Sequence, residues 1–80
     1  MTDKEKLDAL VSDMAATLRP MVTEIESSTK MTQGHYGRYM SLITQLSGGD
    51  KTQGRFIALA LIEAGGNKNG VNNALHIHGW

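Results

Sequence analysis

Apolar residues in the first third of the chain recur every three or four positions. The spacing runs 4, 3, 4, 3, 4 through Leu7, Val11, Met14, Leu18, Met21 and Ile25. This is the heptad pattern of helices that pack side by side, and Leu10 and Val22 widen the stripe. It predicts a long amphipathic helix that begins at the capping sequence Thr2-x-x-Glu5. We expect the six stripe residues to form the seam of a homo-oligomer.

Pro20 lies inside this stripe. A proline has no amide hydrogen to donate, and its ring crowds the preceding helical turn. Two interpretations follow: the helix kinks at Pro20, or it stops near Arg19 and Pro20 becomes the first residue of a second helix.

The middle of the chain repeats the helical pattern with its own start and stop signals. Thr32 is placed to cap a helix that Gly48 and Gly49 would end, with its apolar side made by Tyr36, Tyr39, Met40, Ile43 and Leu46. Asp50-x-x-Gln53 marks the next helix start. The helix over residues 53–64 is apolar almost all the way round, so we expect it to be the central and most buried element.

Gly65 and Gly66 are predicted to end the central helix, and Asn67 or Asn69 to cap a short last one. That last helix presents Val71, Ala74 and Leu75, and residues 76–80 are expected to be a tail with Trp80 tucked over the core. The fold class is therefore all-α, a compact bundle of four or five short helices in a single domain over residues 1–80.

The length and composition of the chain limit the classes of protein to which it can belong. A chain of 80 residues buries a small core, which favours oligomerisation as added support. It has no cysteine, so disulfides and thiolate metal sites are excluded. No signal peptide or membrane-spanning segment is recognisable, so we expect a cytoplasmic protein without membrane contact.

Charge is unevenly distributed, although the total is zero. Residues 1–26 hold six acids and three bases, a net charge of −3, whereas residues 27–80 hold five bases and two acids, a net charge of +3. This asymmetry predicts two faces of opposite sign, or protomers that meet head to tail. The positive charge is sparse for a dedicated nucleic-acid binder.

The most unusual local composition is residues 34–39, where two tyrosines, an arginine and a histidine lie between glycines. Tyrosine and arginine are enriched at the centres of protein interfaces. We therefore predict a partner- or ligand-binding surface made by His35, Tyr36, Arg38, Tyr39, Lys51, Arg55 and Lys68. In the alternative interpretation both tyrosine rings pack on the core and keep only their hydroxyls at its edge.

A second candidate motif occupies residues 61–77. An apolar helix, a turn at Gly65-Gly66-Asn67-Lys68, and a helix ending in Leu75-x-Ile77 resemble part of the Fis-type helix-turn-helix. The resemblance implies a DNA-binding regulator. In that family the groove-reading helix follows the position matched by Ile77, where this sequence has His78, Gly79 and Trp80. The sequence departs from that family at three positions where the family has small residues, namely His76, Val71 and Asn72. The alternative is a generic helix end followed by a new helix start.

Motifs for metal binding or catalysis are absent. His76 and His78 are two residues apart, which points their side chains in different directions on a helix, and His35 is distant in sequence. The sequence GGDKTQG at 48–54 lacks the spacing of a phosphate loop. We therefore expect no enzyme activity, no metal site and no cofactor.

These observations favour a small interaction protein that binds and inhibits or sequesters a protein partner. A small, cysteine-free helical chain of this kind is similar to the accessory proteins with which phages or mobile elements counter host defences or take over the host. Two other hypotheses stay open: a DNA-binding regulator using the 61–77 hairpin, and an oligomer that sequesters a small anionic ligand such as a nucleotide, held by Tyr36, Arg38 and Tyr39.

Overall fold

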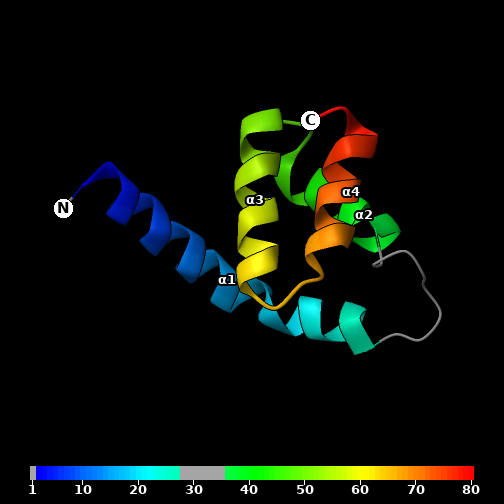
Figure 1. Cartoon of the computed structure of the whole chain (residues 1–80), viewed down its shortest axis with the longest axis horizontal. Coiled ribbons are helices and arrows are strands. Elements are labelled where there is room, and N and C mark those ends of the chain that lie inside the picture. The colour runs from blue at the N-terminus through cyan, green and yellow to red at the C-terminus, as the bar shows by residue number, and fades with distance from the viewer. Residues whose placement is uncertain (1, 28–35) are drawn as a thin grey trace.

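The computed structural model describes residues 2–27 and 36–80, and all regular structure in them is helical (Figure 1). The described residues form four helices: α1 (Asp3–Ser27), α2 (Tyr36–Ser47), α3 (Lys51–Glu63) and α4 (Lys68–His78). The predicted all-α class and the compact four-helix arrangement are confirmed. The expected Thr32 cap lies outside the described residues. None of the described helices contains an apolar stretch that would cross a membrane.

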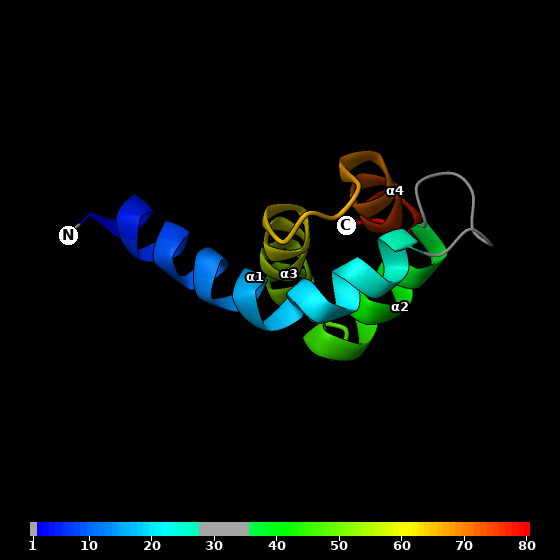
Figure 2. The same ribbon diagram turned by 90° about the horizontal axis from the view of Figure 1, so that it is seen from below.

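The long first helix begins where the capping sequence predicts and continues through Pro20. The backbone N–H of Glu5 donates to the Thr2 hydroxyl at 3.2 Å, which satisfies one of the free donors at the helix start. The division at Arg19 is therefore wrong, since α1 is one helix to Ser27. Its axis changes direction midway along its length in both views (Figures 1 and 2). A proline inside a helix is the usual cause of such a kink.

The end of α2, both ends of α3 and the start of α4 also follow the predicted local chemistry. Gly48 and Gly65, with φ of +63° and +102°, take the left-handed conformation that ends α2 and α3. The Asp50 carboxylate accepts from the backbone N–H of Gln53 at 2.9 Å, and the Asn67 side chain accepts from that of Gly70 at 2.9 Å. Short polar side chains thus start α3 and α4 at the predicted residues.

The helices form a bundle of three with a fourth crossing it. In Figures 1 and 2, α3 and α4 run side by side in opposite directions, and α2 packs against both. The second half of α1 crosses the end of this bundle, whereas its first half extends away from it. This extension accounts for the longest dimension of the molecule, whose principal extents are 42 × 25 × 19 Å.

The core lies between the three-helix bundle and the second half of α1. As predicted, α3 is the central helix, because it contacts each of the other three. Its Ile57, Ala58, Ala60 and Leu61 are almost completely buried, although Leu59 is half exposed. The other helices contribute Ala15, Leu18, Val22, Ile25, Tyr39, Ile43, Val71 and Ala74.

The expectation of a tail over residues 76–80 is wrong for its first three residues, because α4 continues to His78. Gly79 adopts the left-handed conformation, and the N–H groups of Gly79 and Trp80 donate to the carbonyls of His76 and Leu75. This bond pair closes the helix one turn later than expected. Trp80 does pack against the core, which confirms the expected position of its ring.

Trp80 joins the end of α4 to the start of α3. A Cβ atom built on Gly54 would lie 2.1 Å from a carbon of the Trp80 ring, so the ring rests directly on the glycine backbone. The Arg55 guanidinium donates twice to the Trp80 carbonyl, at 3.1 and 2.8 Å. His78 stacks on the ring with a centroid distance of 4.7 Å and contacts Thr44 and Met40 of α2 through Nε2.

Candidate functional site

A groove lies between the second half of α1 and α2. It has a volume of about 350 Å³ and is lined by Met21, Glu24, Ile25, Gly37, Arg38, Ser41, Leu42 and Gln45. The α1 residues are spaced i, i+3, i+4, and the α2 residues span two turns of one helix face, so each helix offers one side to the groove. The groove therefore lies where α1, which packs on α3, passes beside α2.

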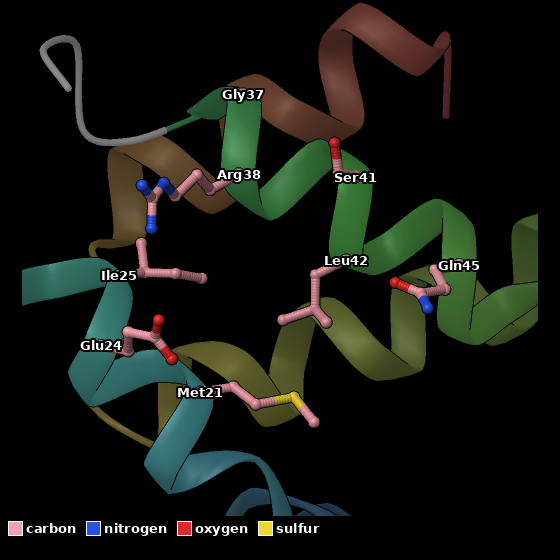
Figure 3. Close-up of a pocket in the computed structure, with 8 residues that line it drawn as sticks. All are labelled: Met21, Glu24, Ile25, Gly37, Arg38, Ser41, Leu42 and Gln45. Carbon is pink, nitrogen blue, oxygen red and sulfur yellow. The ribbon is translucent and has the colours of Figure 1, made fainter. Parts of the chain in front are cut away.

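Three apolar side chains form the floor of the groove. Figure 3 shows Met21, Ile25 and Leu42 turned toward the same space from the two helices. Ile25 is 7% exposed and belongs to the core, Leu42 is partly buried, and Met21 is 44% exposed. The floor thus runs from the core to solvent and offers apolar surface to an incoming side chain.

Polar groups surround this floor. Glu24 and Arg38 stand at one end of the groove and come from different helices, while Ser41 and Gln45 follow along α2 (Figure 3). A carboxylate, a guanidinium, a hydroxyl and an amide can all hold a polypeptide through hydrogen bonds. The groove is therefore suited to an apolar anchor residue with charged or polar neighbours.

A partly buried hydrogen-bond network ties three helices together. The Tyr39 hydroxyl donates to the carboxylate of Glu26, which also accepts from the backbone N–H of Asn67 at 2.7 Å. Glu26 is in the last turn of α1, Tyr39 in the first turn of α2, and Asn67 caps α4. Burial first, and then the hydrogen bond to Glu26, raise the pKa of Tyr39 well above its ordinary value.

This raised pKa predicts a loss of stability at high pH. An unfolded chain releases the tyrosine proton near pH 10, whereas the folded protein holds it, so the Tyr39 contribution is complete below about pH 10 and is lost above it. The slope is up to about 1.4 kcal/mol per pH unit for one proton. Urea unfolding at increasing alkaline pH measures it. Tyr39→Phe should show a shallower decline, and equal slopes in the two proteins would contradict the assignment.

The structure separates the residues predicted to form one binding surface. Of those whose side chains are described, only Arg38 lines the groove. Tyr39 is 0% exposed, so its ring belongs to the core and is not available to stack on a ligand. Lys51 and Lys68 are exposed at the starts of α3 and α4. Arg55 is exposed in the second turn of α3, where it holds Trp80. His35 and the side chain of Tyr36 lie outside what the structure describes.

The predicted oligomer seam is also divided. Leu18 and Ile25 are buried within the chain, and Val11 and Met14 are partly buried against the same core. Leu7 and Met21 are each 44% exposed. Packing within one chain therefore accounts for the middle of the stripe, while its N-terminal end stays uncovered.

The hairpin resembling a helix-turn-helix is formed by α3 and α4, which run antiparallel. In a DNA-reading helix-turn-helix, by contrast, the two helices cross at about 90–120°.

Within residues 2–27 and 36–80 no group of three or more histidines and acids is placed to hold a metal ion.

Sequence reasoning missed five groove residues: Glu24, Gly37, Ser41, Leu42 and Gln45. One signal was present, because Leu42 is a large apolar residue outside the stripe assigned to the core side of α2. Arg38, Leu42 and Gln45 are spaced i, i+4, i+7 and share a helix face. A second apolar face on a short helix indicates a second contact.

Comparison of the chain with known protein families, with curated proteins and with solved structures finds no significant match.

Proposed function

We propose that the protein is a small non-enzymatic interaction protein that binds an amphipathic segment of a protein partner in the α1–α2 groove. Holding that segment would inhibit or sequester the partner. The observation that carries the proposal is the apolar floor of Met21, Ile25 and Leu42, which runs from the core to solvent at Met21 and has Glu24 and Arg38 at one end.

The chemistry of the groove supports this kind of occupant. Amphipathic helices bind grooves through apolar anchors spaced along one face, with polar residues at the margin. Methionine is unbranched and flexible, so Met21 can adjust to the shape of an anchor. Arg38 supplies a residue type that often dominates interface energies. Because Glu24 lies near it, the preferred segment has a base and an acid beside its apolar anchor.

We further propose that the protein works in the cytoplasm as a homo-oligomer, in the manner of accessory proteins of phages and other mobile elements. The uncovered apolar end of α1 supports self-association.

Cross-linking tests the groove. A photoreactive amino acid at Gln45, which is exposed at the groove margin, should attach covalently to the partner in cells. Arg38→Glu or Leu42→Glu should reduce the yield at least about tenfold, since each places a charge unsuited to the anchored segment. Mass spectrometry identifies the product, and binding of the purified partner to each variant gives the Kd.

Arg19→Glu is the matched control, because Arg19 is exposed on α1, carries the same charge and does not line the groove. It should leave both cross-linking and the Kd unchanged. Equal binding by the Arg38→Glu, Leu42→Glu and Arg19→Glu proteins would show that the partner uses another surface.

Duplex DNA is a second candidate, and one observation favours it. Asn69, Asn72, Asn73 and His76 are exposed at i, i+3, i+4 and i+7 on one face of α4, with Lys68 at its start. Asparagine amides recognise base edges in the major groove. Binding that weakens steeply with salt and is reduced in Asn72→Ala would support this alternative, whereas an unaltered affinity in that variant would exclude it.

A further inference from the structure

The first half of α1 leaves the bundle, and the described residues of its own chain give it little cover. Residues 2–10 are all exposed, and Ala15 is the first deeply buried residue of the helix. Figures 1 and 2 both show this segment projecting beyond the other helices. Leu7 and Leu10 on it are 44% and 57% exposed.

The projecting segment has the pattern of a packed helix. Asp3, Leu7, Leu10 and Met14 are spaced i, i+4, i+7, i+11, so three apolar residues and one acid share a face. Helical segments of this length are marginal in water unless an apolar face packs against something. We therefore expect the apolar face of this segment to pack against a surface outside its own chain.

A shallow apolar hollow lies at its base, between α1 and α3. It has a volume of about 340 Å³ and is lined by Leu7, Leu10, Thr52, Gln53 and Phe56. Leu59, one turn beyond Phe56 on α3, is 50% exposed and extends the apolar surface along that helix. We call the surface formed by Leu7, Leu10, Phe56 and Leu59 the α1–α3 face.

We propose that a second copy of this chain covers the α1–α3 face. The two copies are related by a two-fold axis, and the projecting half of α1 from each lies on the α1–α3 face of the other. This inference rests on the proposed self-association and uses a surface separate from the α1–α2 groove. In a two-fold dimer one patch must complement itself, so leucines on a helix meet a hollow that the same leucines help to line.

Charge supports the same occupant. Residues 3–13 hold four acids and two bases, a net charge of −2: Asp3, Glu5, Asp8 and Asp13 against Lys4 and Lys6. The start of α3 presents two exposed bases, Lys51 and Arg55, against one acid, its capping residue Asp50. The acidic segment of one copy therefore approaches the basic start of α3 in the other, and complementary charge favours the encounter.

Sedimentation equilibrium of the full chain at micromolar concentration tests the proposal. The unaltered protein should have the mass of two chains of 8.7 kDa each. Leu10→Glu and Leu59→Glu should each raise the dimer Kd at least about tenfold, because each buries an unpaired charge at the interface. Both residues are half exposed in the single chain, so circular dichroism should show that the fold survives.

Ser12→Glu is the control, because Ser12 is exposed on α1, two residues from Leu10 and so on the other side of the helix. It should remain dimeric. A monomeric unaltered protein would overturn self-association altogether, whereas a dimer that persists in both leucine variants would overturn this surface and leave self-association standing. Neither result would alter cross-linking at Gln45, which reports on the α1–α2 groove alone.

Discussion

Tyr39→Ala is expected to lower the free energy of unfolding by about 3–5 kcal/mol, the range for removing a buried aromatic ring. The Tyr39 side chain is 0% exposed, and its hydroxyl donates to Glu26. A chain of 80 residues has a total stability of about 4–12 kcal/mol, so the substitution removes a large share of it. Urea unfolding followed by circular dichroism measures the change.

Tyr39→Phe separates the ring from its hydroxyl. It keeps the packing and should cost about 1.5–3 kcal/mol, the net value of a hydrogen bond to a charged group. If Tyr39→Ala were instead as stable as the unaltered protein, the ring would lie outside the core and would be available to a partner.

The second large effect is that Gly54→Ala should change from destabilising to stabilising when Trp80 is replaced by alanine. In the unaltered protein Gly54→Ala should destabilise the fold by about 1–3 kcal/mol, because the new methyl group displaces the Trp80 ring. In a Trp80→Ala background that obstacle is gone. The same substitution should then stabilise α3 by about 0.5–1 kcal/mol, since alanine favours a helix interior more than glycine does.

A double-mutant cycle of these two substitutions measures the coupling directly. Trp80 is the single tryptophan of the chain, so its fluorescence also reports whether the ring has left Gly54. An effect of the same sign in both backgrounds would mean that the ring does not rest on Gly54.

Local chemistry explains which parts of the fold were predictable. Thr2, Asp50 and Asn67 start helices through bonds to residues three positions away, and a single sequence contains that information. The central place of α3 follows likewise from apolar residues such as Ile57 and Leu61 around its circumference.

Contacts between distant segments explain what was missed. The pattern placed Tyr39 on one side of a helix, but only the docking of α1 and α4 decides that this side faces Glu26 and Asn67. The extension of α4 to His78 depends in part on a Trp80 ring that rests on Gly54, 26 positions earlier. The α1–α2 groove has the same origin, because neither helix contains it alone.

The kink in α1 has a mechanical consequence. Leu10 in the α1–α3 face and Ile25 in the groove are 15 residues apart on one helix, which at about 1.5 Å per residue separates them by about 22 Å. A helix is a stiff rod except where a backbone hydrogen bond is missing, and Pro20 lies between the two positions. The helix α1 therefore bends most easily at Pro20. Strain at one of the two proposed contacts is therefore expected to change the angle between the two halves of α1 at Pro20. This change of angle is the main way in which the strain is transmitted to the other contact.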